Sequence, residues 1–277
     1  MRRNTLRDIW DDGGAALGGW LTVPCGFSAE IMANSGFDWV CVDMQHGLIG
    51  ETRMVEMLQA ISSSSSVPLC RVPRNEPGVI GKCLDAGAWG VIVPMVNTPE
   101  EAAAAVLSCR YSPFGVRSYG PLRARYYAGF DYFERADEEV LCIVMVETKQ
   151  AVENVEEIAA VPGVDAIYVG PADLSVTLGL PPAADQAAEE FCDALERILG
   201  ACERNDVVPG IAGNADVAVK RLAQGFRLVE VASDSGLIGL GAGRALSQVR
   251  QGRAGPRAVG AGDGADPPEA EPRSAYL

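Results

Sequence analysis

The sequence predicts a single (β/α)₈ barrel of the TIM type. Strand-like apolar runs alternate with helical patterns eight times, and the runs are apolar on both faces, as in barrel strands covered on both sides. The length of 277 residues also suits one barrel, which takes about 250 residues. Eight units indicate closure of the sheet. A doubly wound open sheet is the alternative, disfavoured because no GxGxxG motif opens the first unit.

The expected elements alternate strictly along the chain. The strands are expected at residues 15–23, 37–43, 67–72, 90–95, 140–147, 164–170, 207–212 and 227–232. The helices are expected at residues 28–35, 52–61, 76–86, 98–109, 149–160, 185–204, 214–224 and 237–250. Together they predict one barrel domain over residues 1–250. Residues 251–277 are rich in Gly, Pro, Ala and acids, have little to bury, and are expected to form a disordered tail.

Composition disfavours several classes of protein. A net charge of -14 argues against a nucleic-acid partner, which needs a basic face, and no apolar run approaches the ~18 residues of a membrane span. The eight cysteines form no CxxC pair and lie in apolar runs, which is typical of buried thiols in a reducing cytoplasm. The basic start lacks the apolar stretch of a signal peptide. We therefore expect a cytoplasmic protein that acts on small molecules.

One connection, residues 110–139, is longer than loops in compact domains usually are. It carries aromatic residues and four arginines between Arg110 and Arg125. Because long loops are usually functional or disordered, and this one has much to pack, we expect an ordered role in the site or in a subunit interface.

Polar side chains stand where the expected strands end. Asp43 closes the second strand and is followed by His46, Arg71 closes the third, Glu147 the fifth, and Asp173 follows the sixth. Since the active site of such a barrel lies at the carboxyl ends of its strands, these side chains are expected to converge.

Glu147 and Asp173 are candidates for two carboxylate ligands of one cation. Mg²⁺ typically takes one or two protein carboxylates and fills its other positions with water and substrate oxygens. With one histidine in the chain and no suitably spaced cysteine pair, a zinc site is not expected. The alternative for each acid is a salt bridge at the barrel rim, and Asp173 has a further one, the capping of a short helix.

Three other features can serve chemistry or structure. His46, the sole histidine, suits proton transfer near neutral pH, with a structural role at the strand end as the alternative. Arg71 needs a partner at the end of a buried strand; it either pairs with a neighbouring acid or holds a carboxylate or enolate oxygen. The turn 170–173 offers backbone amides to a substrate carboxylate, although Pro171 has no N–H.

Several short strings occur together and in unbroken order over roughly residues 15–250. They are Gly36-Phe37-Asp38-Trp39 leading to Asp43 and His46-Gly47, Arg71-Val72-Pro73, Leu84-Asp85-Ala86-Gly87, Val93-Pro94-Met95-Val96, Arg110-Tyr111-Ser112-Pro113 with Gly115 and Arg117, Glu147-Thr148, and Val169-Gly170-Pro171-Ala172-Asp173-Leu174-Ser175. As a set they resemble the HpcH/HpaI aldolase family, the class II pyruvate aldolases that include 4-hydroxy-2-oxoheptanedioate aldolase.

This resemblance implies roles for the matching residues. Glu147 and Asp173 would be the metal-binding carboxylates, with Mg²⁺, Mn²⁺ or Co²⁺ as the divalent metal. Arg71 would be the essential arginine beside the 2-oxo acid. His46 would be the catalytic histidine, and Asp85 its carboxylate partner, reaching in from a neighbouring subunit.

The resemblance also implies the rest of the pocket and an assembly. Asp43 belongs to the same strand-end motif as His46, and Trp20 would form a wall of the pocket. Gly170, Ala172 and Asp173 would offer backbone contacts to the substrate. The family commonly forms homo-oligomers, as hexamers that are trimers of dimers, with sites near the subunit interfaces.

Three positions depart from the family pattern. Gln45 stands where many relatives have Glu, and Met145 where some have Gln two residues before the metal glutamate, so a hydrogen bond behind the metal site would be missing. Arg117 is followed by Ser118-Tyr119-Gly120-Pro121 instead of a shorter glycine pattern. The first and third of these departures suggest a subgroup and concern the acceptor aldehyde more than the enolate chemistry.

The expected activity is a reversible aldol addition or cleavage between an aldehyde and the enolate of pyruvate or a similar 2-oxo acid. The metal route needs no Schiff-base lysine, and the chain has only Lys82, Lys149 and Lys220. One rival is a related C–C lyase or synthase that uses oxaloacetate or an acyl thioester. Another is a non-catalytic barrel that binds a 2-oxo acid.

Overall fold

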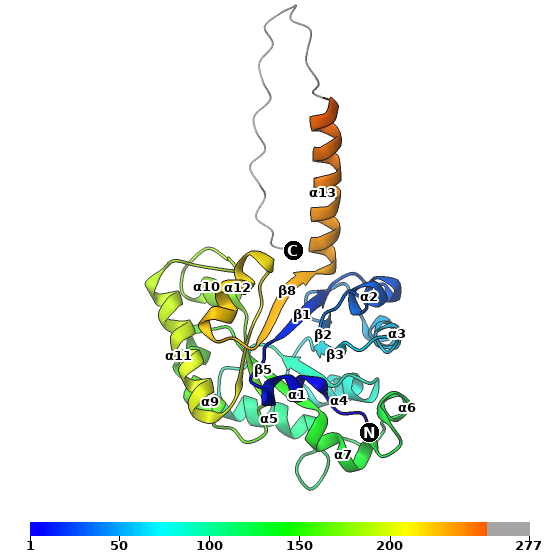
Figure 1. Cartoon of the computed structure of the whole chain (residues 1–277). Coiled ribbons are helices and arrows are strands. Elements are labelled where there is room, and N and C mark those ends of the chain that lie inside the picture. Colours follow the sequence, from blue (N-terminus) through cyan, green and yellow to red (C-terminus); the bar gives the residue numbers. More distant parts are fainter. Residues whose placement is uncertain (254–277) are drawn as a thin grey trace, which may run out of the picture. The chain divides into compact units, whose positions relative to one another are not determined.

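A computed structural model describes residues 1–253 and shows a closed barrel of eight parallel strands in chain order (Figure 1). The strands are β1 (Ala16–Leu21), β2 (Trp39–Asp43), β3 (Val67–Arg71), β4 (Gly90–Val93), β5 (Leu141–Val146), β6 (Ala166–Val169), β7 (Val208–Ile211) and β8 (Leu228–Ser233). Each strand pairs with the next, and β8 pairs with β1 to close the barrel. The predicted (β/α)₈ barrel is confirmed, and the open sheet is excluded.

The helices expected between the strands are present. They are α2 (Gly26–Ala33), α3 (Glu51–Ile61), α4 (Pro77–Asp85), α5 (Pro99–Cys109), α8 (Lys149–Glu153), α9 (Val155–Ala159), α11 (Glu189–Asn205) and α12 (Ala215–Gln224). The helix expected at 149–160 is thus two short helices that meet at Asn154, whose side-chain amide donates to the carbonyl of Asn97. A side chain that binds the backbone elsewhere competes with helix continuity at such a position.

Four helices were not among the expected ones: α1 (Thr5–Asp11), α6 (Ala124–Ala128), α7 (Tyr132–Glu139) and α10 (Pro171–Thr177). The first of them covers the amino ends of the strands. Trp10 donates to the carbonyl of Arg227 just before β8, Asn4 to that of Trp89 before β4, and Arg7 pairs with Asp165 before β6. Since α1 closes this end, the opposite end remains for the site.

The long connection at 110–139 is ordered, as expected. It contains α6 and α7, and Arg110 ties its start to Asp165 through an ion pair of 3.0 Å. Several of its large apolar side chains are nevertheless exposed: Phe114, Val116, Tyr119, Leu122, Tyr126 and Phe130. An apolar surface of this kind is typical of a protein–protein contact.

Inside the barrel, aromatic rings from strands on opposite sides meet. The ring of Trp20 on β1 stacks on Tyr168 of β6 with centroids 5.8 Å apart, and Trp39 of β2 meets both rings edge-on. Because β6 is not a neighbour of β1 or β2, these contacts cross the barrel interior. A Cβ at Gly18 would lie 1.9 Å from the Trp39 ring, so only glycine leaves room for this indole. The rings form a floor beneath the carboxyl ends of the strands.

The chain divides into two compact units, Met1–Asp234 and Ser235–Leu277. The first contains the whole barrel. The second begins within α13 (Asp234–Arg253), which corresponds to the helix expected at 237–250. The tail expected at 251–277 lies, beyond Arg253, outside the described residues. Among residues 1–253, no helix is both long and apolar enough to cross a membrane.

Candidate active site

Asp43 and Arg71 form a buried ion pair at the carboxyl ends of β2 and β3. The two residues are register partners in the sheet. The Nε and Nη2 atoms of Arg71 donate to the two carboxylate oxygens of Asp43 at 2.9 and 2.6 Å. The pairing with a neighbouring acid, one of the two alternatives for Arg71, is therefore observed. This two-point geometry fixes the plane of the guanidinium.

The environment of the pair favours its charged form. Burial acts to raise the pKa of Asp43, but the hydrogen bonds and positive charge of Arg71 outweigh it, and the pKa lies below its ordinary value. Trp20 also stabilises the carboxylate, and its ring lies 5.0 Å from the Arg71 guanidinium carbon. Trp20 therefore lies beside Arg71 at this end of the barrel.

Glu147 follows β5 and is also buried, but no cationic side chain among residues 1–253 is in contact with it. Its Oε1 accepts a hydrogen bond of 2.8 Å from the backbone N–H of Met95. Met95 has a φ of 57°, in the left-handed region that a non-glycine residue adopts only when its surroundings hold it there. This conformation at the end of β4 accompanies the hydrogen bond to the carboxylate of Glu147.

The carboxyl group of Glu147 lies against the start of α10. A Cβ at Gly170 would stand 2.3 Å from Oε2 of Glu147, so glycine is required there. Asp173 lies in the first turn of the same helix and is exposed. Burial first, and then the negative charge of Asp173, raise the pKa of Glu147 to about 7, against the lowering effect of Met95 and Arg71. The two predicted metal acids are thus near enough to repel each other.

His46 and Asp85 are not paired within the chain. The backbone N–H of His46 donates to Asp43 at 3.2 Å, while its side chain is exposed. In residues 1–253 the imidazole makes no hydrogen bond. Asp85, at the end of α4, instead accepts a hydrogen bond of 2.8 Å from the buried guanidinium of Arg117. The predicted histidine–carboxylate pair would therefore need a second subunit.

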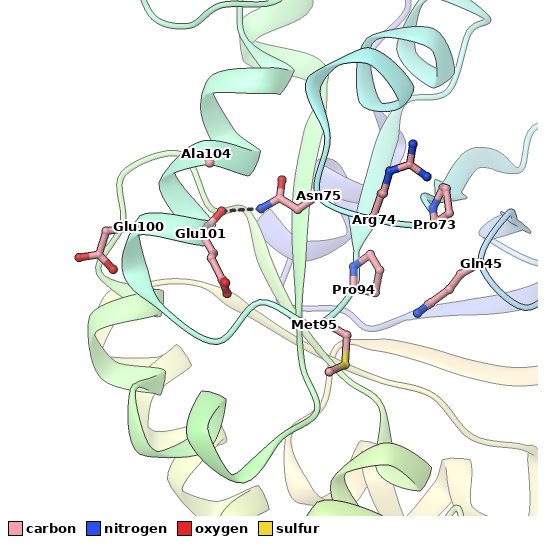
Figure 2. Close-up of a pocket in the computed structure, with 9 residues that line it drawn as sticks. All are labelled: Gln45, Pro73, Arg74, Asn75, Pro94, Met95, Glu100, Glu101 and Ala104. Carbon is pink, nitrogen blue, oxygen red and sulfur yellow. Dashed lines mark hydrogen bonds between the residues drawn. The ribbon is translucent and has the colours of Figure 1, made fainter.

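A cavity of about 500 Å³ adjoins Asp43 and Glu147, and Figure 2 shows the residues that line it. It is lined by Gln45, Pro73, Arg74, Asn75, Pro94, Met95, Glu100, Glu101 and Ala104. Two of the lining residues are hydrogen-bonded to acids of the site. The backbone N–H of Met95 donates to Glu147, and that of Gln45 donates to Asp43 at 3.0 Å. The side-chain Oε1 of Gln45 is buried and has no partner among the described residues.

Two features of the site were not foreseen from the sequence. The first is the hydrogen bond from the N–H of Met95 to Glu147, which depends on a left-handed backbone conformation that no sequence motif predicts. Glu230 on β8 is buried inside the barrel; the available signal was an acid between apolar strand residues, before the strand end.

Comparisons with known proteins decide the family. Residues 20–239 match the model of the HpcH/HpaI aldolase/citrate lyase family. A hydroxypyruvate/pyruvate aldolase of Rhizorhabdus wittichii is 38% identical over 251 residues, 89% of this chain and 99% of the relative. The chain belongs to the HpcH/HpaI aldolase/citrate lyase family.

Solved structures of this family superpose well on the chain. A family protein from Burkholderia cenocepacia has a TM-score of 0.83 at 35% identity, covering 89% of this chain and 99% of that one. The citrate synthase SbnG has a TM-score of 0.81 at 28% identity, covering 91% and 99%. The family resemblance inferred from the short sequence strings is confirmed. By its family, the chain is a carbon–carbon lyase.

Proposed function

We propose that this protein is a divalent-metal-dependent aldolase that makes or breaks a C–C bond next to the enolate of pyruvate or a similar 2-oxo acid. The observation that carries the proposal is the buried Glu147 carboxyl beside Asp173, with one N–H donor and a pKa raised to about 7. The similarity to a hydroxypyruvate/pyruvate aldolase supports the choice of 2-oxo acid.

Glu147 and Asp173 would hold the metal. Two carboxylates close enough to raise a pKa are the donor set that a hard cation takes from a protein, with water and substrate oxygens completing its shell. Mg²⁺, Mn²⁺ or Co²⁺ suits these oxygen ligands. A divalent cation bound there would supply Lewis-acid stabilisation of an enolate oxygen.

Arg71 would stabilise the same oxygen from the other side. Asp43 takes Nε and Nη2, and no described residue is hydrogen-bonded to Nη1, so this nitrogen is available to a substrate oxygen. The Glu147 charge acts on Arg71, which supports placing the guanidinium and the proposed metal acids in one site. One such donor is typically worth ~3 kcal/mol in the transition state.

His46 would move the proton at the reacting carbon, with Asp85 of a neighbouring subunit as its carboxylate partner. The exposure of the imidazole and its lack of a partner in residues 1–253 support completion of the site by a second chain. The exposed apolar side chains at 110–139 offer a surface for such a homo-oligomer, and Arg117 from this segment holds Asp85. A hexamer, as a trimer of dimers, is the assembly we propose.

The substrate would lie between these groups and the adjoining cavity. The backbone at Gly170, Ala172 and Asp173 would hold the carboxylate of the 2-oxo acid at the start of α10, and Trp20 would close the far side. The cavity lined by Gln45 and Met95 would take the aldehyde, because both residues are hydrogen-bonded to the acids that face the enolate.

A second candidate is a citrate-forming activity, favoured by the similarity to the citrate synthase SbnG. Both activities use an enolate, but the acceptor differs: an aldehyde in one case, and the 2-oxo group of oxaloacetate in the other. Turnover of oxaloacetate with an acyl thioester, and none of aldehydes with pyruvate, would establish the second activity.

An aldehyde panel with pyruvate and Mg²⁺ or Mn²⁺ tests the proposal. We expect C–C bond formation that EDTA abolishes, no turnover by Glu147→Ala, and no borohydride-trapped adduct with pyruvate. A trapped adduct would identify a Schiff-base mechanism and contradict the metal assignment. Ligand binding without turnover of any 2-oxo acid would instead indicate a non-catalytic barrel.

A further inference from the structure

Glu230 is a buried acid that the proposed chemistry does not use. It lies within β8, between Val229 and Val231, and is 9% exposed. Buried glutamates almost always have a partner. In the part of the chain that the structure describes, its carboxyl receives one hydrogen bond, from the N–H of Gly213 at an N···O distance of 3.4 Å. That is beyond the usual range for such a bond, so it offsets little of the cost of burying a charge.

Four titratable groups face Glu230 from three other strands: Cys41 and Asp43 of β2, Arg71 of β3 and Tyr168 of β6. Burial raises the pKa of Glu230 to about 8; Gly213 and Arg71 act against this shift, and Asp43 adds to it. The carboxyl is therefore uncharged at neutral pH, although a guanidinium is within electrostatic reach.

The groups around Glu230 connect it to the arginine of the site. The hydroxyl of Tyr168 is buried and has no hydrogen-bond partner among residues 1–253. Its ring stacks on Trp20, and Trp20 in turn lies under the Arg71 guanidinium, 5.0 Å from its carbon. Tyr168, Trp20 and Arg71 thus form one continuous stack, and Glu230 is within electrostatic reach of both Tyr168 and Arg71.

We propose that Glu230 is a positioning residue for Arg71: its buried carboxyl makes no hydrogen bond to the guanidinium, which stays paired with Asp43. An ionised Glu230 would be a second buried carboxylate competing for the same cation. The competition would draw the guanidinium toward the floor and away from a substrate oxygen. This inference rests on the proposed function and adds a residue to it.

The first test compares the wild type with Glu230→Gln, which keeps the shape and removes the charge. Exchange of the pyruvate methyl protons with D₂O, with Mg²⁺ present, needs no aldehyde. Wild-type kcat/KM is expected to fall above about pH 8 through a rise in KM, because Arg71 contacts the bound 2-oxo acid. In Glu230→Gln this fall is expected at least one pH unit higher, with exchange at pH 7 within about threefold of wild type.

The matched control is Glu139→Gln, a buried glutamate at the amino end of the barrel that binds Asn4. It is expected to keep the wild-type pH profile. An unchanged alkaline fall in Glu230→Gln overturns the proposal, and so does an equal displacement in the control. If Glu230→Gln does not fold, Glu230→Met takes its place, with the same displacement expected and the same result overturning the proposal.

A second measurement does not depend on turnover. A carboxyl whose pKa is raised by folding stabilises the protein most at low pH, and this contribution is lost as the pH rises toward 8. In EDTA, the urea midpoint of the wild type is expected to fall more steeply from pH 5 to 8.5 than that of Glu230→Gln. If the wild type shows no exchange at any pH, the proposed function fails. The urea comparison then decides alone, and equal slopes overturn the uncharged carboxyl on which the inference depends.

Discussion

The two sides of the barrel mouth balance buried charge differently. On the side of β2 and β3, Asp43 and Arg71 neutralise each other through two short hydrogen bonds, and the pKa of Asp43 is lowered. On the side of β5 and β6, Glu147 lies near a second acid, Asp173, and its pKa is raised to about 7. The charges on one side are balanced within the chain, whereas those on the other would be balanced by the proposed cation.

The two sides therefore differ in what neutralises their charge. Asp43 and Arg71 neutralise each other, whereas the charge of Glu147 and Asp173 would be neutralised by a ligand. The Asp43–Arg71 pair contributes to the folded state whether or not substrate is present. The burial of Glu147 and the nearby charge of Asp173 disfavour the ionised form of Glu147, a cost that the proposed cation would offset on binding. Glu147→Gln and the Arg71 variants each change one side and leave the other, whereas Gln45→Glu changes the adjoining cavity.

The largest effect is expected from Glu147→Gln, which removes a proposed metal ligand and keeps the side-chain shape. Turnover is expected to fall by on the order of 10³-fold or more, because Lewis-acid stabilisation of the transition state is worth several kcal/mol. Steady-state assays with saturating Mg²⁺ measure this. The exposed Glu153 on α8 provides the control, and Glu153→Gln is expected to retain wild-type activity. Near-normal turnover of Glu147→Gln would contradict the two-sided account.

Arg71→Lys is expected to lower kcat/KM by about 10²-fold, because a point charge cannot replace a planar donor worth ~3 kcal/mol. Arg71→Ala should also destabilise the fold by about 3–5 kcal/mol, since Asp43 would remain buried without its partner. Chemical unfolding measures the second effect. The control is Arg53, which is exposed on α3, is paired with Glu56 and does not line the cavity, so Arg53→Lys should change neither value much.

Metal binding should depend on pH through Glu147. Folding raises the pKa of this carboxyl from 4.5 to about 7, so its stabilising contribution is full below pH 4.5 and is lost as the pH rises through 7. A shift of about 2.5 units corresponds to at most about 3 kcal/mol. Because a metal requires the ionised carboxylate, Mg²⁺ should raise Tm more at pH 8 than at pH 5.5. Equal increases in thermal scans at both pH values would count against the assignment.

The smallest effect is expected from Gln45→Glu, which changes the cavity and neither charged side. The side chain of Gln45 lines the cavity, while its backbone N–H binds Asp43. One hydrogen bond of about 1 kcal/mol corresponds to a change of about fivefold in KM for the aldehyde. Exchange of the pyruvate methyl protons should not change. A large loss of exchange would place Gln45 in the enolate chemistry instead.

The barrel was predictable because its signal is periodic and repeated eight times. Apolar strands buried on both faces and helices between them leave few other architectures. Helices α6 and α7 were missed because their sequences are short and mixed. The split at Asn154 depends on a hydrogen bond to Asn97, a residue more than fifty positions away, so no local pattern announces it.

Residues of the candidate site could be predicted only where a charged side chain lies at the end of a strand. Asp43, Arg71 and Glu147 follow apolar runs, and the fold brings them together. The partner of Asp85 in the chain, Arg117, was not foreseen because it comes from the long connection. Glu230 was missed because the sequence does not show which residues face the barrel interior, and an acidic residue within a strand is usually exposed to solvent.

The most direct test of a cation shared by Glu147 and Asp173 is to measure the binding of Mn²⁺ to the whole chain with electron paramagnetic resonance. The account predicts one ion per chain at pH 8, with binding strongly weakened in both Glu147→Gln and Asp173→Asn and unchanged in Glu153→Gln. Retention of wild-type affinity in both acid variants would show that the two carboxylates do not share a cation.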